Sequence, residues 1–405
     1  MEPVPAPPTD KTGPYREERL ERSTSRNPLR TAALAIAIAA ASLTIAACGG
    51  GGDLSEGSSN EDVTTATAGE PTGKLKISNW PLYIDDQTIR EFEKETGIEV
   101  EYVEDMNDND EFFGKVQPLF SQGDSGGRSI IVTTDWMSTK MHDLGYIQNL
   151  DRAELPVVDE NILPSLKNPD FDPNRNFTVP WQSGMTGLVV REDLAPDIKS
   201  INDLFDPKYK GKVTVLLEMR DTIPVMLLAA GIDPADATTE DWMEQIDKLQ
   251  RNVDNGQIRR FTGNDYIQDL VKGSVVAAIG WSGDAVQAQL DNPNINYVQP
   301  TEGCGLWSDN MMIPAGAPDT AAAYEFMNYV YQPENMAQIV EWVNYISPVE
   351  GVKEILRKKD PALANNELIF PTEEFLAGCS TSDTPPGDEA AVREVETAFQ
   401  NVLTG

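Results

Sequence analysis

Histidine is nearly missing from this sequence, which has a single one, His142, in 405 residues. Cysteine is scarce too, with only Cys48, Cys304 and Cys379. A His-based catalytic triad and a metal site built from clustered His or Cys are therefore not expected. The phosphate-binding patterns GxGxxG and GxxxxGK[ST] and the zinc pattern HExxH are also missing. We expect no cofactor, no metal and no catalytic chemistry.

Positive charge is in short supply as well. The 32 Lys and Arg residues face 66 Asp and Glu, which gives a formal net charge of −34. Nucleic acid is not expected as a partner, because its phosphates would be repelled. The charge would help to steer a cationic ligand, but acidity that serves only solubility explains it equally well. Charge alone therefore does not identify a ligand.

The sequence begins with a pattern typical of export. A basic region that ends at Arg30 precedes the apolar residues 31–47, and small residues lead into Cys48. The apolar stretch is at or below the ~17 to 25 residues that span a bilayer, which disfavours a transmembrane helix. The four residues up to Cys48 resemble the lipobox of bacterial lipoproteins. We predict a lipoprotein signal peptide over residues 1–47 and an extracytoplasmic protein, lipid-anchored through Cys48 to the outer face of the cell membrane.

A polar linker separates this signal from the body of the protein. Residues 48–73 contain almost no large apolar side chain, so we expect a flexible tether. Residues 74–405 are too many for one ordinary core and favour two domains. Outside the cytoplasm, Cys304 and Cys379 could pair in a disulfide or stay free, and the sequence does not decide between the two.

The body alternates predicted strands and helices. A short strand at residues 75–78 precedes a helix that Asp85 or Asp86 can cap and that Gly97 ends. A strand at residues 98–103 follows, and the alternation resumes in a second segment before a mainly helical C-terminal third. This pattern predicts the α/β class, with a mostly parallel sheet in two α/β units.

Aromatic and acidic side chains gather in five clusters beside the predicted strands. Four clusters directly follow a strand, where ligands of open α/β sheets bind, and the fifth, with Trp307 and Asp309, precedes one. The residues concerned are Trp80, Tyr83, Trp136, Glu218, Asp221, Trp281, Asp284, Trp307 and Asp309. Ring faces attract cations, and carboxylates bind ammonium groups by charge-assisted hydrogen bonds. The set suits an aliphatic amine, although a sugar site would also be lined with rings. Any one of these residues can instead be a core residue or a helix cap, and for Asp284 we favour the cap.

At these residues the chain resembles the bacterial spermidine/putrescine-binding proteins of ABC transporters. The resemblance rests on Asn79-Trp80-x-x-Tyr83, the run DPKYKGK at residues 206–212, and Trp307-x-Asp309, in this order. It covers roughly residues 75–345 and extends more loosely to the end of the chain.

The resemblance implies the periplasmic-binding-protein fold, in which two α/β lobes joined by a hinge close over a ligand in the interlobe cleft. The chain would cross between the lobes, so each lobe would be discontinuous. We expect lobe 1 to hold residues 74–182 and 309–351, and lobe 2 to hold residues 183–308 and 352–405.

The resemblance also implies a polyamine site. Its rings would enclose the methylenes of the ligand: Trp80, Tyr83, Trp136, Trp281, Trp307 and Tyr345. Glu218 and Asp221 match an acidic pair that holds one amine end, and Asp309 matches the carboxylate for an inner or opposite amine. Glu218 stands where the family usually has Asp, and Asp221 where it usually has Glu, which leaves the preferred ligand length open. The implied function is a monomeric binding protein that delivers a polyamine to an ABC transporter permease.

Two alternatives remain. One is a protein of the same fold that binds another small solute, such as an amino-acid derivative or a sugar. A carboxylate on that solute would need a buried Arg, for which Arg220 is the obvious candidate near the cleft. The other is a secreted hydrolase that uses paired carboxylates, such as Glu218 and Asp221.

Overall fold

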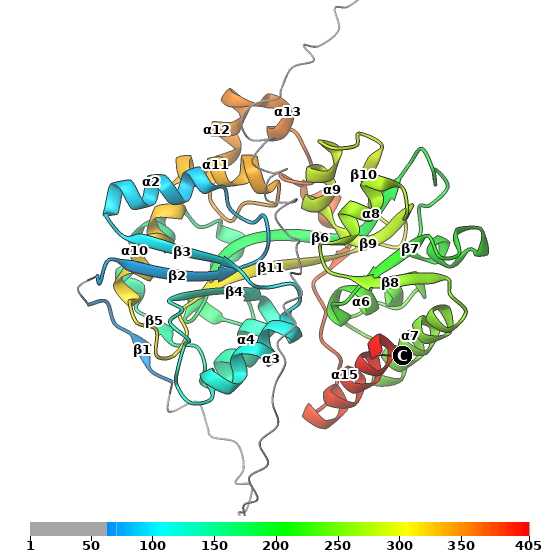
Figure 1. Ribbon diagram of the computed structural model, residues 1–405, viewed down its shortest axis with the longest axis horizontal. Helices are drawn as coiled ribbons and strands as arrows, with labels where there is room; N and C mark the ends of the chain where they lie inside the picture. The colour runs from blue at the N-terminus through cyan, green and yellow to red at the C-terminus, as the bar shows by residue number, and fades with distance from the viewer. Residues whose placement is uncertain (1–62, 70, 405) are drawn as a thin grey trace, which may run out of the picture. The chain divides into compact units, whose positions relative to one another are not determined.

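The computed structural model describes residues 63–69 and 71–404, of which residues 74–380 contain a ten-stranded mixed sheet (Figure 1). The predicted signal peptide, Cys48 and the first part of the predicted tether lie outside this range. In order along the sheet, the strands are β3 (Glu99–Glu104), β2 (Lys74–Asn79), β4 (Ile130–Thr134), β11 (Cys304–Met312), β6 (Val179–Arg191), β9 (Ala277–Trp281), β7 (Val213–Leu216) and β8 (Ile258–Thr262). Beside this path, β10 (Ile295–Val298) pairs with β6, and β12 (Cys379–Ser380) pairs with β11.

The sheet consists of two parallel parts joined by two antiparallel strands. β2 is parallel to β3 and β4, and β7 is parallel to β8 and β9. Between these parts, β11 and β6 run antiparallel to each other and to their outer neighbours β4 and β9. A mostly parallel sheet was the expectation, and it is correct within each part but not where the parts meet.

Helices gather around the two parts of the sheet and form two lobes (Figure 1). Lobe 1 surrounds β2, β3 and β4 with α2 (Asp86–Thr96), α3 (Asn109–Phe120), α4 (Asp135–Asp143), α10 (Thr320–Val330) and α11 (Pro333–Val343). Lobe 2 surrounds β7, β8 and β9 with α6 (Met219–Ala229), α7 (Thr239–Asp254), α8 (Tyr266–Lys272), α9 (Ser282–Gln289) and α15 (Glu389–Thr404). β6 and β11 extend from one lobe into the other. Within the described range, no helix combines the length and the apolar character that crossing a membrane requires.

Most of the lobe boundaries expected from the sequence stay predictions, but one segment lies elsewhere. α12 (Val352–Lys359) packs against α11 of lobe 1 and against α13 (Pro361–Ala364). The segment that begins at residue 352 was expected in lobe 2. The chain reaches lobe 2 further on, first where Gln299 donates a hydrogen bond to the Phe375 carbonyl and then where α15 packs against α7.

Local sequence explains the first helix and the central strands. The Asp85 side chain accepts a hydrogen bond from the backbone N–H of Thr88 at 2.8 Å, which caps α2. Gly97 ends the helix in the left-handed conformation, with φ of 74°. Every residue of β6 is buried, in keeping with a strand covered on both faces. The core of lobe 1 lies between sheet and helices, where the Phe92 ring contacts Phe326 with 5.2 Å between ring centroids.

The predicted flexible tether extends too far, because its last residues are bound to lobe 1. β1 (Thr65–Ala66) pairs in parallel with β5 (Asn149–Leu150). Tyr324 donates a hydrogen bond to the Ala66 carbonyl at 2.6 Å, and the Thr72 hydroxyl donates one to Asp319 at 2.6 Å. We call this attachment of residues 64–69, 71 and 72 the clamp. Its hydrogen bonds use mainly backbone groups, so a composition poor in large apolar residues does not reveal it.

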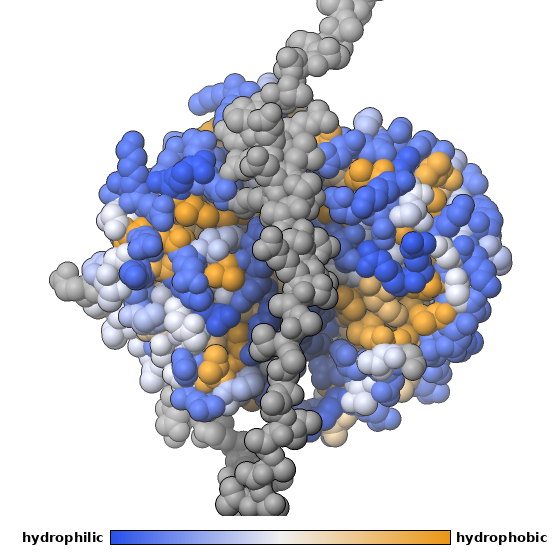
Figure 2. All heavy atoms as spheres, in the orientation of Figure 1, coloured by the Kyte–Doolittle hydropathy of each residue, from blue (hydrophilic) through white to orange (hydrophobic). Residues whose placement is uncertain are grey.

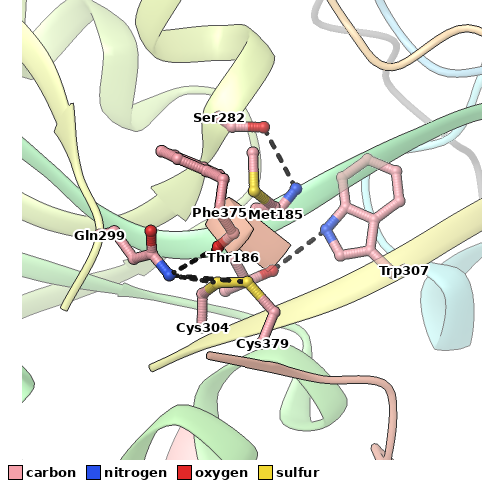
Figure 3. The surroundings of a disulfide bond; sticks show 8 residues. All are labelled: Met185, Thr186, Ser282, Gln299, Cys304, Trp307, Phe375 and Cys379. Atoms are coloured by element: carbon pink, nitrogen blue, oxygen red, sulfur yellow. Dashed lines mark hydrogen bonds between the residues drawn. A yellow bond between two sulfur atoms is a disulfide. The ribbon is translucent and has the colours of Figure 1, made fainter. Parts of the chain in front are cut away.

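A disulfide joins the C-terminal segment to a strand that extends between the lobes. Cys304, at the start of β11, is bonded to Cys379 in β12, 75 residues further along the chain (Figure 3). Figure 3 also shows Trp307 on the same strand, donating a hydrogen bond to Thr186 of β6. The disulfide therefore lies three residues along β11 from Trp307, which the sequence singled out. The face of the molecule in Figure 2 is largely hydrophilic, in line with the excess of acidic residues.

Candidate functional site

A cavity of about 40 Å³ between the lobes collects all but one of the predicted ligand residues. We call it the cage. The predicted residues in its wall are Trp80, Tyr83, Glu218, Asp221, Trp281, Trp307, Asp309 and Tyr345. Pro81, Asn109, Thr134, Asn264, Asp284 and Gln287 complete the wall. Among the described residues that line the cage, none is Lys, Arg or His.

The ends of the parallel strands position these side chains. Trp80 directly follows β2, Thr134 is the last residue of β4, and Trp281 is the last residue of β9. Glu218 lies two residues after β7, at the start of α6. The carboxyl ends of neighbouring parallel strands lie at the same edge of a sheet. The two parallel parts therefore bring these side chains to the same cavity. Asp309 differs, because it lies within β11, beside a register irregularity.

Aromatic rings from both lobes form the apolar part of the wall. Trp80 of lobe 1 lies edge-on to Trp281 of lobe 2, with 6.5 Å between ring centroids. Tyr345, which follows α11, contacts Tyr83 at 5.3 Å and Trp307 at 5.6 Å, again between centroids. All five rings are buried or half-buried. The Trp80–Trp281 and Tyr83–Tyr345 pairs pack edge to face, an arrangement that aromatic pairs favour, and the Trp307–Tyr345 pair is tilted.

Two glycines allow the rings to come this close. A Cβ atom at Gly283 would lie 2.4 Å from the Tyr345 ring, and one at Gly184 would lie 2.5 Å from the Trp307 ring. Real side chains do not tolerate such distances, so any larger residue would displace the ring. The shape of the cage therefore depends on residues that carry no functional group.

Glu218 connects the lobes at the start of α3. Its Oε1 accepts hydrogen bonds from the backbone N–H of Asn109 at 2.7 Å and from the Asn109 side chain at 2.8 Å. A carboxylate at a helix N-terminus is favourable. Even so, burial, together with the nearby Asp108 and Asp221, raises the pKa of Glu218 well above its ordinary value.

The pKa values of the other two predicted acids, the half-buried Asp221 and the buried Asp309, are raised as well. Trp281 donates a hydrogen bond to Asp221 at 3.1 Å, and Thr186 donates a short one. Burial nevertheless raises the pKa of Asp221 to about 6. Asp309 accepts a hydrogen bond from the Tyr83 hydroxyl at 2.9 Å, and burial raises its pKa to about 8. Removal from water disfavours the charged form of each carboxyl group, and the wall offers no cation to offset it.

Asp284 is not the helix cap that we expected. α9 begins after Trp281, and no side chain caps it. Asp284 instead accepts hydrogen bonds from Tyr345 at 2.9 Å, from Tyr266 at 2.9 Å and from Asn264 at 3.0 Å. Burial raises its pKa to about 6. The bond from Tyr345 joins the two lobes, and the carboxyl group is a fourth acid in the cage wall.

Trp136 is the predicted residue that the structure leaves out of the cage. It lines a larger hollow on the other side of Trp307, together with Arg220. The guanidinium carbon of Arg220 lies over the Trp136 ring, 3.9 Å from its centroid. Arg220 also donates a hydrogen bond to Glu396 at 2.9 Å. The buried Arg that a carboxylate ligand would need therefore points away from the cage.

Sequence reasoning missed several residues of the wall. Thr134 and Asn264 stand at or just after the ends of β4 and β8, so the strand-end rule could have found them. Asn109 and Gln287 lie on helices, and nothing local in their sequence separates them from ordinary helix residues. Among the described residues, no group of three or more His, Cys, Asp or Glu has the arrangement of a metal site.

Comparison with known proteins identifies the family of this two-lobed fold. The family model of the bacterial extracellular solute-binding proteins matches residues 87–371. The chain belongs to this family. The expected α/β fold of two lobes with an interlobe cleft is confirmed.

The names of several relatives of this chain state what those relatives bind. This chain is 26% identical over 315 residues to the spermidine/putrescine-binding periplasmic protein of Escherichia coli (strain K12), covering 77% of this chain and 87% of that protein. It is 29% identical over 336 residues to the putrescine-binding periplasmic protein PotF of the same strain, covering 78% and 88%. The solved spermidine/putrescine ABC transporter substrate-binding protein PotD of Streptococcus pneumoniae is 27% identical, with a TM-score of 0.66, covering 82% of this chain and 98% of that chain.

Proposed function

We propose that this solute-binding protein captures a polyamine of the putrescine or spermidine type in the cage and delivers it to an ABC importer. One observation carries the proposal: three buried carboxyl groups, the half-buried Asp221 and a set of aromatic rings share a wall in which no described residue is Lys, Arg or His. A diamine or triamine supplies the missing positive charges at its amines and apolar surface between them. The names of the relatives agree with this ligand class.

The raised pKa values give a physical reason for ligand selection. Buried carboxyl groups without a cation favour their neutral forms, as Asp309 does with a pKa of about 8. A protonated amine placed beside them stabilises the carboxylates and forms charge-assisted hydrogen bonds worth about 1.5–3 kcal/mol each. Each ring face that meets an ammonium adds roughly 0.5–2 kcal/mol. Binding in the cage is therefore favourable for a cation and unfavourable for an anion.

Each predicted residue has a role in this proposal. Glu218 and Asp221 hold one ammonium group, and Asp309 holds an inner or opposite one. The rings of Trp80, Tyr83, Trp281, Trp307 and Tyr345 enclose the methylenes. Because Glu218 and Asp221 exchange the usual positions of Asp and Glu, the preferred length of the polyamine stays open.

We further propose a monomeric protein outside the cytoplasm, held by lipid on Cys48 to the outer face of the cell membrane. The signal-like residues 1–47 support this location, as do the relatives named as periplasmic proteins. A permease in the same membrane would receive the ligand. The protein would bind and release its ligand unchanged, without catalysis.

The alternative ligands are less well supported. A solute with a carboxylate would need a cationic group in the cage, whereas Arg220 lies on Trp136 and is paired with Glu396. A carboxylate-pair hydrolase would need Glu218 beside a scissile bond, whereas Glu218 is engaged by the first residue of α3. No observation favours either function over polyamine capture.

Calorimetry tests the proposal directly. The purified protein, freed of ligand by unfolding and refolding, is titrated with putrescine, cadaverine, spermidine and spermine. Succinate, whose four-carbon chain carries two negative charges, is the matched control. We expect tight binding of at least one polyamine and none of succinate. A folded, ligand-free sample that binds none of the four polyamines would refute the proposal.

A further inference from the structure

Trp136 and Arg220 meet between the lobes, outside the cage. Trp136 is the second residue of α4 in lobe 1, and Arg220 is the second residue of α6 in lobe 2. The Arg220 guanidinium lies over the Trp136 ring with its carbon 3.9 Å from the ring centroid. This separation is well within the ~6 Å over which cation–π attraction operates. The ring face that a ligand ammonium could have used is thus covered by a cation of the protein itself.

In this position, two nitrogen atoms of the Arg220 guanidinium lack hydrogen bonds to the described part of the chain. Arg220 is 8% exposed, and its Nη2 donates to Glu396. Its Nε and Nη1 are buried and have no hydrogen-bond partner among the described residues. A buried cation in this state is unfavourable unless another contact offsets it. The Trp136 face is the contact that the structure provides on the side of lobe 1.

Arg220 belongs to the same helical turn as the acids of the cage. Glu218 and Asp221 are three positions apart and point into the cage, whereas Arg220 points to the hollow on the other side. Any movement of this turn relative to lobe 1 moves the acids and the guanidinium together. The place of the acids over the ligand is therefore linked to the contact between Arg220 and Trp136.

We propose that Trp136 and Arg220 are positioning residues for capture, which join the lobes through a cation–π contact and so hold Glu218 and Asp221 over the cage. The inference rests on the proposed function for its ligand. Neither residue touches the polyamine. The contact raises the fraction of molecules with the lobes together, and the apparent affinity rises by the same factor for every ligand that needs this state.

The prediction from the family resemblance differs, since it places Trp136 on the ligand as a ring of the site. A ligand ring would affect long and short polyamines differently and would act without regard to Arg220. A contact between lobes would affect all polyamines equally and would be lost with either partner. A double-mutant cycle separates these two possibilities.

The variants for this cycle are Trp136→Leu, Arg220→Met and the two combined. Trp136→Phe and Arg220→Lys serve as conservative variants, and Arg393→Met, at an exposed arginine of α15, serves as the control. Affinities for putrescine and spermidine are measured by calorimetry, and dissociation rates by stopped flow. Ligand-free thermal unfolding reports whether each variant is folded.

We expect each single substitution to weaken both polyamines by the same factor, about 2- to 30-fold. The combined variant should be no weaker than the weaker single variant, because one contact is lost in all three. The loss should appear as faster dissociation. Trp136→Phe should restore part of the affinity, and Arg393→Met should change nothing. Additive losses, a loss that differs between putrescine and spermidine, or unchanged affinities would each overturn the proposal.

Small-angle scattering of the ligand-free protein keeps this test separate from the proposed function. Weakening the contact should increase the radius of gyration of Trp136→Leu and Arg220→Met relative to the wild type and to Arg393→Met. If the wild type binds no polyamine, the proposed ligand fails, and the scattering result alone decides on the contact. Equal radii in all ligand-free variants would then reject it.

Discussion

The hydroxyl of Tyr83 donates a hydrogen bond to Asp309 across 2.9 Å, and both side chains are 4% exposed. Tyr83 lies in the segment after β2, whereas Asp309 lies within β11, which extends into both lobes. The bond therefore joins the segment after β2, in the wall of the cage, to the strand that extends between the lobes. It also occupies one oxygen of Asp309, so an incoming ammonium group meets a carboxyl whose orientation is already set.

Replacing this carboxyl by an amide tests its role. Asp309→Asn keeps the size of the side chain and removes its charge. We expect a loss of about 1.5–3 kcal/mol in polyamine binding free energy, since one charge-assisted hydrogen bond is lost. Tyr83→Phe removes only the orienting bond and should cost less. Calorimetry with both variants checks the order, and full affinity in Asp309→Asn would place the ammonium elsewhere.

Polyamine affinity should rise with pH between about 5 and 8. Burial raises the pKa of Asp221 and Asp284 to about 6 and that of Asp309 to about 8 in the free protein. A bound cation favours the ionised carboxylates, so binding releases protons. Titrations at pH 7 in buffers of different ionisation enthalpy should detect this release. Asp309→Asn should release fewer protons, and a pH-independent affinity would contradict the prediction.

The same groups predict how the stability of the ligand-free protein depends on pH. A carboxyl whose pKa is raised on folding binds its proton more tightly in the folded state. Its contribution to stability is complete below the ordinary value of 3.8 and is lost as the pH rises through about 6 for Asp221 and about 8 for Asp309. The melting temperature without ligand should therefore fall between pH 5 and pH 8. Saturating polyamine should remove most of that fall.

Gly283→Ala should weaken binding although glycine contacts no ligand. The added Cβ would lie 2.4 Å from the Tyr345 ring, so the ring must move and its hydrogen bond to Asp284 is lost. We expect a loss of about 0.5–1.5 kcal/mol in binding for that bond alone. Gly114→Ala is the matched control, because nothing lies within 4 Å of a Cβ there. Equal affinities in the two variants would show that Tyr345 is free to shift.

The disulfide should contribute to stability. Cys304 and Cys379 are 75 residues apart, and a crosslink over a loop of this order typically contributes about 2–4 kcal/mol, chiefly by restricting the unfolded chain. The double substitution Cys304→Ala with Cys379→Ala should lower the free energy of unfolding by that amount in urea titrations. Reducing agent should have the same effect on the wild type and none on the variant. An unchanged midpoint in both experiments would contradict the prediction.

The clamp should protect residues 64–69, 71 and 72 from hydrogen exchange. Tyr324→Phe removes the hydroxyl that donates to the Ala66 carbonyl, so backbone amides in this segment should exchange faster. Tyr331→Phe is the control, because its hydroxyl bonds to Pro180 in a different place. Polyamine affinity should stay the same in both variants. Equal exchange in Tyr324→Phe and the wild type would mean that strand pairing alone holds the clamp.

Residues at strand ends could be predicted from sequence because two simple rules combine. Local patterning locates the strand before Trp80 and the one before Glu218, and parallel pairing then brings both ends to one edge of the sheet. Neither step requires knowledge of side-chain packing. Trp281 follows the same logic in lobe 2.

Trp136 and Asp284 show where this reasoning stops. Both stand in the first turn of a helix, and their directions depend on how that helix lies against the other lobe. Arg220 takes the face of Trp136, and Tyr345 takes an oxygen of Asp284. These are contacts between segments far apart in the chain, which no local pattern contains. The docking of Ala66 was missed for a related reason, since backbone hydrogen bonds leave no signature in composition.

The clamp has a mechanical consequence. A load applied to the chain ahead of Thr64 enters the body where β1 pairs with β5, both on the side of lobe 1 (Figure 1). Lobe 1 then bears the load, and lobe 2 bears none of it. Rotation of lobe 2 about β6 and β11 does no work against such a load. Whatever holds the protein from its N-terminal side therefore restrains one lobe and leaves the other free to open and close.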